Sequence, residues 1–563
     1  MNKPVLSFFY AISLLLLLIF NEACKSKSSK KDAAKEVKPV DLTVTAENAY
    51  FPAFFDSTSI DSFLQRNPSF AVHSLEIKNF YRQRNFQYAW HDSVGLAEHT
   101  NAFMNRLEQS LNAQQQADSN LVHQVQDISD RVYWGANNKV STEPNIEDDL
   151  LLTAMFFQYV ARENSTTSEK DIKELGWYIP KKKIDYLQAL SALLNDTNKI
   201  GQMHPMYFLL QKQLVALKKI QADYDANPIT QKLSKSIPPD GTDPIVKTIR
   251  KKLYQLNDLK TPDTTREIYS KELYEAVVNF RKRHGLKRDT TIAADMITAL
   301  NVPIAQRIKT MSINMERLRW MPADMYPDYL LVNIPEFKVH AFKHDSLQWS
   351  MRVVVGKENT KTVIFKDEMT HVVFSPYWYP PRSIIRGEIF NNLKRNPSGY
   401  LSRQGMEIVN SESDKTPVSP ASIAWKNYNA DNFPYIIRQK SGTKNALGKV
   451  KFIFPNEHSI YMHDTPSKSF FENTTRAQSH GCIRLAEPQK MAEWVLRNNP
   501  EWTTKKIVEA MNKGSEVYAK ITPPLPVIIG YFTSWVDTKG NLNFRPDIYE
   551  RDLSMAKKLY AEK

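Results

Sequence analysis

Cysteine is scarce in this chain, with only two among 563 residues. No internal apolar run reaches the about 20 residues needed to cross a bilayer, so we expect no internal membrane span. Zinc-ligand spacings, basic helices and aromatic–glycine RNA motifs are also missing, which argues against a nucleic-acid partner. The net charge of +14 therefore favours a different anionic partner, such as lipid headgroups or an acidic polymer.

The N-terminus has the pattern of a targeting segment. Lys3 precedes an apolar stretch over residues 5–20, and the small residue Ala23 stands directly before Cys24. This pattern resembles a bacterial lipoprotein signal over residues 1–24, which implies a lipid on Cys24. We therefore expect a periplasmic protein anchored to a membrane through Cys24, on the outer membrane and facing the cell wall. An uncleaved signal anchor is the alternative.

The other cysteine, Cys482, needs a separate explanation. Residues 25–49 begin with a polar stretch rich in Lys and Ser, and we expect a disordered tether there. If Cys24 carries a lipid, Cys482 has no disulfide partner. A single thiol left over in an exported protein is most often a reactive one.

The first half of the chain reads as helical. Leucines and aromatics recur every three or four residues over 50–241, which predicts a helical scaffold domain. Residues 242–303 predict a separate three-helix bundle. Its first helix starts at Asp243-Pro244, a cap followed by a favoured first residue, and its second helix covers about 270–284 and stops at Gly285.

The pattern changes to short β-strands after residue 304. Apolar and β-branched residues cluster between turns, which predicts a mainly β domain over 304–550, followed by a C-terminal tail over 551–563. A polar, loop-rich segment over about 384–444 interrupts this domain. Inserted loops of such length often serve as lids or binding segments, so we expect a cap over a site, with an irregular excursion as the alternative.

Cys482 lies in a cluster of chemically active residue types, Ser479-His480-Gly481-Cys482-Ile483-Arg484-Leu485. A cysteine nucleophile needs its thiolate, and a neighbouring histidine can take the proton. His480 is too close along the chain to aim easily at the sulfur, so we prefer His463 as the base. Asp464 is adjacent to His463 and could orient the ring through its carboxylate or through its backbone carbonyl.

The remaining residues of the cluster suggest supporting roles. Gly481 lets the backbone approach a substrate closely, as an oxyanion site of backbone N–H groups requires. Arg484 supplies positive charge near a thiolate or a fork for a substrate carboxylate. Ser479 and His480 can stabilise the turn by hydrogen bonds. The simpler alternative is a buried structural cysteine, which is the commoner case for an isolated one.

Together, His463-Asp464-Thr465 and residues 479–485 resemble the L,D-transpeptidases, the family of the YkuD-type catalytic domain. The likeness extends to residues 378–384 and 445–452. Residues 80–90, 531–536 and 544–549 resemble the large YcbB-type branch of that family. The resemblance implies a multidomain α+β fold, with an N-terminal helical scaffold, a small peptidoglycan-binding-like three-helix bundle, and a mainly β catalytic domain interrupted by a capping subdomain.

The resemblance also implies a reaction. Cys482 would attack the carbonyl between a diamino acid and the terminal D-Ala of a peptidoglycan stem, forming a thioester that the amine of a second stem resolves into a 3→3 cross-link. His463 would act as general base, the amides of Gly481 and Cys482 would hold the oxyanion, and His480 and Arg484 would shape the pocket. No metal and no organic cofactor is implied.

Several alternatives stay open. Water could resolve the thioester, which would make the protein an L,D-carboxypeptidase or a cross-link hydrolase, and a wall-binding lipoprotein without activity is a further reading. A papain-like peptidase fits less well because its nucleophile precedes its histidine. The bundle lacks the glycines usual after its middle helix in the wall-binding family, so it could bind peptidoglycan or only brace the enzyme. Trp378, Tyr379 and Tyr461 are candidate substrate contacts or core aromatics.

Overall fold

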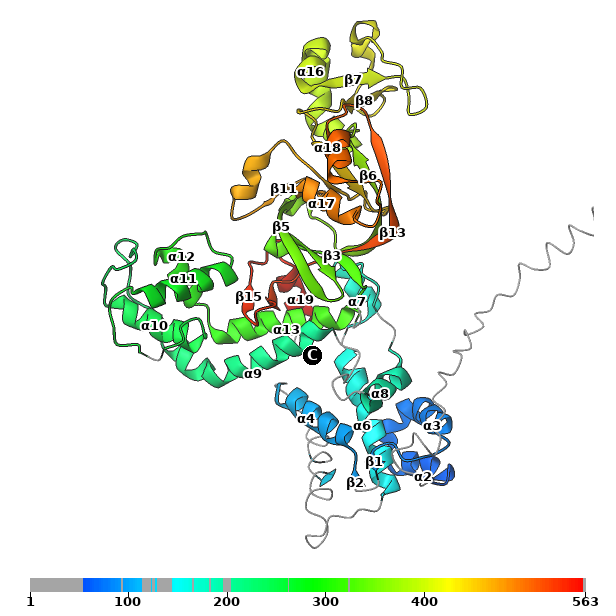
Figure 1. Ribbon diagram of the computed structural model, residues 1–563, viewed down its shortest axis with the longest axis vertical. Helices are drawn as coiled ribbons and strands as arrows, with labels where there is room; N and C mark the ends of the chain where they lie inside the picture. Colours follow the sequence, from blue (N-terminus) through cyan, green and yellow to red (C-terminus); the bar gives the residue numbers. More distant parts are fainter. Residues whose placement is uncertain are drawn as a thin grey trace, which may run out of the picture. The chain divides into compact units, whose positions relative to one another are not determined.

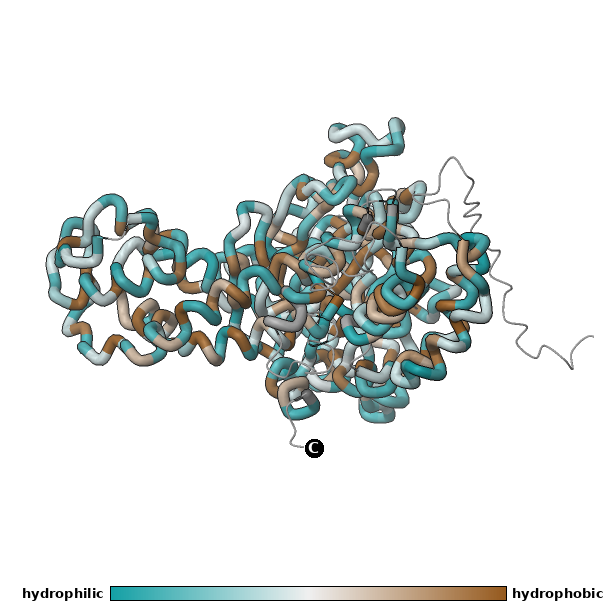
Figure 2. Tube along the Cα trace, turned by 90° about the horizontal axis from the view of Figure 1, so that it is seen from below, coloured by the Kyte–Doolittle hydropathy of each residue, from teal (hydrophilic) through white to brown (hydrophobic). Residues whose placement is uncertain are grey.

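The computed structural model describes residues 54–559, apart from gaps at 93–94, 114–122, 124–126, 129–143, 165–166, 182–183, 196–203, 262 and 323–324. The expected signal, Cys24 and the whole of the expected tether over 25–49 lie outside the described residues. Within them, no helix combines the length and apolar character that spanning a membrane requires. Figure 2 shows polar and apolar residues interleaved along the described chain.

The chain divides into two compact units, residues 1–102 with 125–158 and residues 103–124 with 159–563. The expected scaffold range 50–241 therefore contributes to both. In the first unit, the chain forms α2 (Thr58–Arg66), η1 (Pro68–His73), α3 (Ser74–Gln83), β1 (His91–Asp92), β2 (Gly95–Leu96) and the starts of α4 (Glu98–Ala113) and α6 (Ile146–Asn164).

A buried carboxylate organises the first unit. Asp149 on α6 accepts hydrogen bonds from the Tyr81 hydroxyl (2.6 Å) and from the backbone amides of Ala89 (3.1 Å) and Trp90 (2.9 Å). The Trp90 indole donates to Thr153 Oγ1 on the same helix (2.8 Å). Because every one of these groups is buried, the network fixes the extended segment before β1 against α6.

The helices of the second unit include the predicted bundle. Up to residue 320 these helices are α7 (Glu169–Glu174), α8 (Tyr186–Asn195), α9 (Pro205–Ala226), α10 (Ile245–Gln255), α11 (Lys271–Arg283), α12 (Ala294–Leu300) and α13 (Ile304–Trp320). The Asp243 carboxylate accepts from the Ile245 amide (3.0 Å), so the predicted cap starts α10. Buried apolar residues of α10, α11 and α12 form one core, and α9 packs along α13.

The bundle is fixed to the rest of the second unit by a buried cation. Arg283 on α11 forms an ion pair with Asp258 in the loop after α10. The same guanidinium donates to the carbonyl of Leu542 (3.0 Å), which lies in the C-terminal hairpin. Breaking one side of such a pair would leave a buried charge unpaired, so the contact holds the bundle in one orientation.

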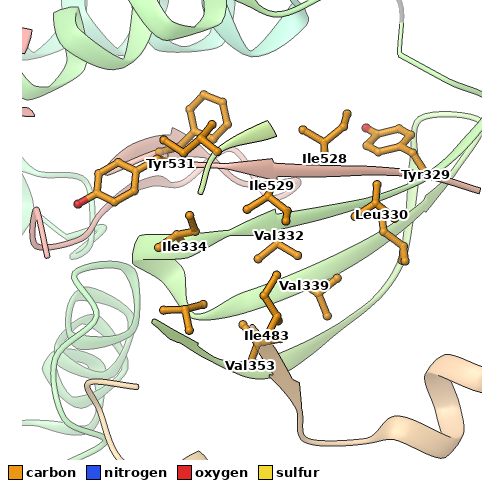
Figure 3. Packing of buried hydrophobic residues seen from close by; sticks show 14 of the residues in the cluster. Tyr329, Leu330, Val332, Ile334, Val339, Val353, Ile483, Ile528, Ile529 and Tyr531 are labelled. Atoms are coloured by element: carbon orange, nitrogen blue, oxygen red, sulfur yellow. The ribbon is translucent and has the colours of Figure 1, made fainter. Parts of the chain in front are cut away.

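The part of the second unit after α13 is built on a sheet with the strand order β11-β5-β12-β10-β9-β6-β13-β3-β4. A further pairing of β4 with β5 closes this order on itself. The strands are β3 (Asp328–Asn333), β4 (Lys338–Lys343), β5 (Ser346–Gly356), β6 (Phe365–Phe374), β9 (Val450–Ile453), β10 (Met462–His463), β11 (Ala477–Ser479), β12 (Ile483–Leu485) and β13 (Val517–Gly530). Figure 3 shows the apolar side chains that β3, β4, β5, β12 and β13 direct into the core.

Between β6 and β9 the chain forms a compact insertion, which Figure 1 draws in yellow-green. It comprises α14 (Arg382–Ile384), the π-helix η4 (Ile385–Ile389), α15 (Phe390–Arg395), α16 (Pro397–Gln404), the paired strands β7 (Met406–Val409) and β8 (Ile436–Gln439), and the short helices η5 (Pro420–Ser422) and η6 (Trp425–Asn427). The insertion has its own apolar core, so it is a folded subdomain and not an irregular excursion.

The C-terminal part adds α17 (Pro488–Val495), α18 (Thr504–Met511), the hairpin β14 (Ser534–Val536) and β15 (Leu542–Phe544), and α19 (Arg551–Leu559). Where we expected a tail over 551–563, residues 551–559 thus form a helix. Asp552 on α19 pairs with the buried Arg317 on α13 (2.5 Å), and Lys558 pairs with Asp171 on α7 (2.6 Å). These contacts tie α19 to two helices distant in sequence.

Candidate active site

The register of strands β10 and β12 brings His463, Arg484 and Cys482 onto one face of the sheet. Strands β10 and β12 run parallel, with Met462 opposite Ile483 and His463 opposite Arg484. Met462 and Ile483 are fully buried in the core. Since successive side chains of a strand point to opposite faces, His463 and Arg484 face away from the core. The Ile483 amide bonds to the Tyr461 carbonyl (3.1 Å), which continues the ladder to the residue before each strand.

The same alternation places Tyr461 and Cys482 on the face of His463. The rings of Tyr461 and His463 have centroids 5.6 Å apart, which agrees with the placement of Tyr461 on this face. From a strand spacing of about 4.8 Å and a rise of about 3.3 Å per residue, the Cα atoms of His463 and Cys482 are on the order of 8 Å apart. Side chains of this length can meet across that distance.

The His463 ring is oriented by a backbone carbonyl. Its Nδ1 lies 2.5 Å from the carbonyl oxygen of Asp464, and a carbonyl can only accept. The ring is therefore protonated at Nδ1, which leaves the lone pair of Nε2 free to take a proton. Of the two orienting groups left open by the sequence, the structure uses the carbonyl.

The Asp464 carboxylate has a different task. Its Oδ1 accepts from the Thr465 amide (2.7 Å) and from Lys468 Nζ (2.6 Å), and its Oδ2 accepts from the Lys449 amide (2.9 Å). A Cβ on Gly448, which has φ +60°, would collide with this carboxylate. The carboxylate thus holds the turn before β9 against the strand that carries His463.

The loop before Cys482 is fixed by a chain of hydroxyl groups. Ser479 Oγ donates to the Cys482 carbonyl (2.6 Å) and accepts from the Gly481 amide (3.1 Å). Thr362 Oγ1 donates to the Gly481 carbonyl (2.7 Å). Tyr549 donates to the neighbouring Gly356 carbonyl (2.5 Å) and accepts from the Thr362 amide (3.3 Å). Gly481 adopts φ +116°, a conformation that side-chain-bearing residues rarely take.

These bonds affect the expected oxyanion site. Of its two expected donors, the Gly481 amide is already bonded to Ser479 Oγ. Among the described residues, the Cys482 amide makes no such bond. Of the two expected donors, the Cys482 amide is therefore the one without a partner in the described residues, whereas the Gly481 amide helps to fix the bend of the loop.

The thiol lies among polar groups. Its Sγ is 3.8 Å from the Ser459 carbonyl, and no hydrogen bond joins it to His463 within the described residues. Burial raises the pKa of the Cys482 thiol, whereas hydrogen bonds from Tyr461 and the charges of Lys451 and Arg484 lower that pKa. Catalytic hydrogen bonds often tighten only when substrate binds, so the absence of this bond does not exclude His463 as the base.

Burial and positive charge keep His463 neutral. Burial, and after it the Arg484 charge, lower the pKa of His463 from its usual 6.5 to about 3, although the bond to the Asp464 carbonyl acts in the opposite direction. Because the pKa of Cys482 is raised, both directions favour a neutral thiol beside a neutral imidazole.

The other predicted residues lie around this centre. His480 is exposed and pairs with Glu388 of the insertion, Nε2 to Oε1 3.0 Å. Trp378 is half-buried and exchanges two backbone hydrogen bonds with Gln439, where the insertion begins and ends. Tyr379 is 39% exposed, and its hydroxyl accepts from Arg438 (3.3 Å).

The sequence reasoning missed several residues of the site. Lys451 lies on β9 opposite His463, and its ammonium is 5.3 Å from the centroid of the Tyr461 ring. Ser459, Thr362 and Tyr549 were also not singled out. The alternation of Val450, Lys451 and Phe452 between apolar and charged could have indicated that Lys451 shares the face of His463. Nothing in the sequence marks the other three.

Comparisons with known proteins agree with this arrangement. Residues 327–527 match the family of the L,D-transpeptidase catalytic domain, YkuD, and residues 75–214 match the Scaffold domain. The protein therefore contains an L,D-transpeptidase catalytic domain of the YkuD family, preceded by a scaffold domain. Among the described residues, no group of three or more His, Cys, Asp or Glu side chains could hold a metal ion.

A protein of Haemophilus influenzae named "Putative L,D-transpeptidase" is 29% identical over 293 residues. That alignment covers 51% of this chain and 58% of the relative. Crystal structures of L,D-transpeptidases from Xylanimonas cellulosilytica and Stackebrandtia nassauensis share 12% identity with the chain. The alignments cover 53% and 54% of this chain and 100% and 98% of the two crystallised chains, with TM-scores of 0.17 and 0.21.

Proposed function

We propose that the protein forms 3→3 cross-links in peptidoglycan through a thioester on Cys482. One observation carries the proposal: Cys482 and His463 occupy one face of adjacent parallel strands, and the bond from Nδ1 to the Asp464 carbonyl leaves Nε2 as the base. Membership of the L,D-transpeptidase family supports the substrate class, a stem peptide whose diamino acid is followed by D-Ala.

The first half-reaction makes the acyl-enzyme. His463 Nε2 takes the thiol proton as Sγ attacks the carbonyl of the diamino acid. The Cys482 amide stabilises the oxygen that becomes negative. The C–N bond then breaks, and the imidazolium returns its proton to the departing D-Ala nitrogen. The acyl group stays on sulfur as a thioester.

The second half-reaction transfers the acyl group. The side-chain amine of another stem attacks the thioester, and His463 takes one of its protons. The C–S bond breaks, Cys482 leaves as a thiolate and recovers the proton, and a new amide joins the two stems. Water in place of the amine would give hydrolysis, so the identity of the acceptor decides between cross-linking and trimming.

The test is incubation of the enzyme with a disaccharide-tetrapeptide, followed by mass analysis of the products. We expect a dimer together with released D-Ala, and neither product with Cys482→Ala. A tripeptide alone would assign the protein to the L,D-carboxypeptidases. A substrate that stays intact would contradict the proposed function.

We also propose a place for this reaction. The N-terminal pattern ending at Cys24 supports a lipoprotein on the outer membrane, in the periplasm and facing the cell wall. Mass spectrometry of the native protein should find acylglycerol on Cys24. A chain that still starts at Met1 would support an uncleaved anchor instead.

A further inference from the structure

A cavity of about 400 Å³ lies between the α7 segment, residues 169–181, and the loop before β10. Its apolar wall is formed by the buried side chains of Ile172, Trp177 and Ile179. The α7 segment falls within the match to the Scaffold domain, whereas Glu457, on the opposite side, falls within the match to the catalytic domain. Ligand pockets usually enclose about 300–1,000 Å³ and are lined mainly by apolar side chains. The cavity therefore has the size and wall of a small-ligand site, and no step of the proposed reaction uses it.

The wall of this cavity is held in place by two other elements. Arg551 on α19 donates to the Leu175 carbonyl (2.7 Å), which fixes the end of α7. The Tyr178 amide donates to the Ile364 carbonyl (2.9 Å), which attaches the following residues to the start of β6. Because these bonds exist without a ligand, the cavity is preformed, and binding there costs little ordering of the chain.

Four charged side chains line the cavity: Glu169, Lys173, Lys181 and Glu457. Within the described residues, the closest approach to an opposite charge is the 3.8 Å contact between Glu457 and its neighbour His458. Lys181 Nζ donates to the Thr167 carbonyl (3.3 Å), and burial lowers the pKa of this ammonium. Since burial removes water from the ammonium without supplying a carboxylate in contact, a ligand with its own carboxylate would compensate for the lost hydration.

Both signs of charge at the cavity indicate the chemistry of its ligand. Glu169 and Lys173 are four residues apart on α7 and so lie on one face of the helix. An anion and a cation beside each other, over an apolar wall, fit a short peptide that carries a free amine and a free carboxylate. A peptidoglycan stem that ends at its diamino acid is such a peptide, because its side-chain amine and its terminal carboxylate belong to the same residue.

The loop that contributes Glu457 to the cavity also contacts the thiol. The Ser459 carbonyl lies 3.8 Å from Cys482 Sγ, as the acceptor of a thiol hydrogen bond. Ser459 has φ +54°, a left-handed conformation that residues with a side chain seldom adopt. Asn456 Oδ1 holds the loop in this shape by accepting from the Ile460 amide (3.1 Å). Strained backbone of this kind is often part of a switch, since a small shift can release it.

Ring contacts join the same loop to the cavity wall. The ring of Tyr178, which lines the cavity, has its centroid 5.2 Å from that of His458. The His458 ring in turn lies 5.1 Å from the Phe365 ring at the start of β6. A ligand in the cavity therefore meets the loop at two neighbouring residues, Glu457 and His458, directly before the carbonyl that holds the thiol.

We propose that this cavity is a second peptide site, which binds a stem ending in a free diamino acid and thereby draws the 456–460 loop away from Cys482. Lys173 and Lys181 take the carboxylate, and Glu169 and Glu457 take the amine. Loss of the Ser459 contact frees the thiol to give its proton to the base, so a stem with an unused amine activates the enzyme. The inference rests on the proposed function, which supplies the stem as ligand, and adds a site apart from the reacting atoms.

Binding is tested first with a stem tripeptide, which has no residue after the diamino acid for Cys482 to release. Calorimetry uses the full chain with Cys482 alkylated by iodoacetamide, so that the reacting centre is blocked. We expect one tripeptide per chain, and binding on the order of 10-fold weaker for Lys173→Met and Lys181→Met, as loss of a charge-assisted bond predicts. Acetylating the amine of the tripeptide, or amidating its carboxylate, should weaken binding to a similar extent.

Lys170→Met is the matched control. Lys170 carries the same charge on the same helix and is exposed, but it does not line the cavity. Its replacement should leave the affinity for the tripeptide unchanged. Binding that is equal in Lys170→Met, Lys173→Met and Lys181→Met, or no binding to the alkylated wild type, would overturn the site.

The link to the thiol is tested by the rate at which iodoacetamide alkylates Cys482 in the unmodified protein. Saturating tripeptide should make this reaction at least about 5-fold faster, the lower end of usual coupling between sites. The acceleration should persist in Lys170→Met and disappear in Lys173→Met and Lys181→Met at the same tripeptide concentration. An unchanged rate in wild type, or a slowing that is equal in all four proteins, would overturn the link.

Neither measurement requires turnover, so these results are separable from the test of the proposed function. An enzyme that forms cross-links but does not bind the tripeptide after alkylation would refute the cavity site alone. A protein that binds the tripeptide and forms no cross-links would refute the proposed function alone.

Discussion

Glu388 and His480 join the insertion to the loop before Cys482, with Oε1 and Nε2 3.0 Å apart. Both side chains are largely exposed, at 60% and 43%, and exposed ion pairs add little to stability. The pair lies two residues from Cys482 and on the π-helix η4. Its effect is therefore local, because it places one side of the insertion beside the loop that carries Cys482.

Glu388→Gln should leave the free energy of unfolding within about 0.5 kcal/mol of wild type. Hydrogen exchange of residues 385–389 should nevertheless become faster, since η4 loses its contact with the loop. Asp431→Asn, which removes an exposed pair between Arg386 and Asp431 inside the insertion, is the control and should not alter exchange at 479–482. Unchanged exchange at both segments in Glu388→Gln would contradict the link.

Asp464→Asn tests whether the carboxylate of this residue orients His463 or only holds the turn before β9. Because the His463 Nδ1 bonds to the backbone carbonyl, the substitution leaves the tautomer intact, and we expect kcat to fall by less than about 10-fold. Replacing the orienting carboxylate of a Ser-His-Asp triad costs about 10 000-fold by comparison. The lost bonds to Lys449 and Lys468 should lower the free energy of unfolding by about 1–3 kcal/mol. A fall in kcat near the about 10 000-fold loss known for such a triad would show that the carboxylate, and not the carbonyl, orients His463.

Gly448→Ala tests the turn that Asp464 holds. An alanine there must adopt φ +60° and would also collide with the Asp464 carboxylate, so we expect a loss of about 2–4 kcal/mol in urea unfolding. Gly514 has φ +78° with no atom within 4 Å of an added Cβ. Gly514→Ala should therefore cost only the backbone strain, about 1 kcal/mol. Equal losses in the two variants would rule out the close approach at Gly448.

Acid should destabilise the enzyme partly through His463. In the unfolded chain this histidine takes up a proton as the pH falls below about 6.5, whereas the folded protein resists protonation down to about pH 3. Stability from this group is therefore complete above pH 6.5 and is lost as the pH falls, on the order of 3 kcal/mol by pH 4. His463→Gln, with no group to titrate, should lose less stability than wild type between pH 7 and 4 in chemical unfolding. Parallel curves for the two proteins would contradict a buried neutral His463.

Much of this architecture could be predicted from local sequence. Two helices of the bundle were predicted with ends correct to within a residue or two. The signals were the apolar stripe at Ile245, Ile249 and Leu253 and the helix stop at Gly285. The cluster 479–485 together with His463 was enough to predict the family. A thiol enzyme needs a histidine and backbone donors near its cysteine, and this need restricts the residues found around the cysteine. The insertion was visible as polar, loop-rich sequence between strands.

What could not be predicted depends on packing between distant segments. Whether Asp464 orients His463 by its carboxylate or its carbonyl depends on where Lys449 and Lys468 lie after folding. The engaged Gly481 amide depends on how the loop folds back onto Ser479, a hydrogen bond the sequence does not specify. Burial, which lowers the pKa of His463 and raises that of Cys482, is a property of the assembled sheet. The helix α19 was read as a tail because its partners are on α7 and α13.

The most direct test of the account is to trap the acyl-enzyme. The protein is mixed with a tetrapeptide donor without an acceptor, quenched in acid and weighed intact, and the modified peptide is then mapped. The account predicts a mass increase equal to the donor minus D-Ala, on Cys482, labile to hydroxylamine and absent from Cys482→Ala. An adduct on another residue, or product formed by Cys482→Ala at the wild-type rate, would contradict it.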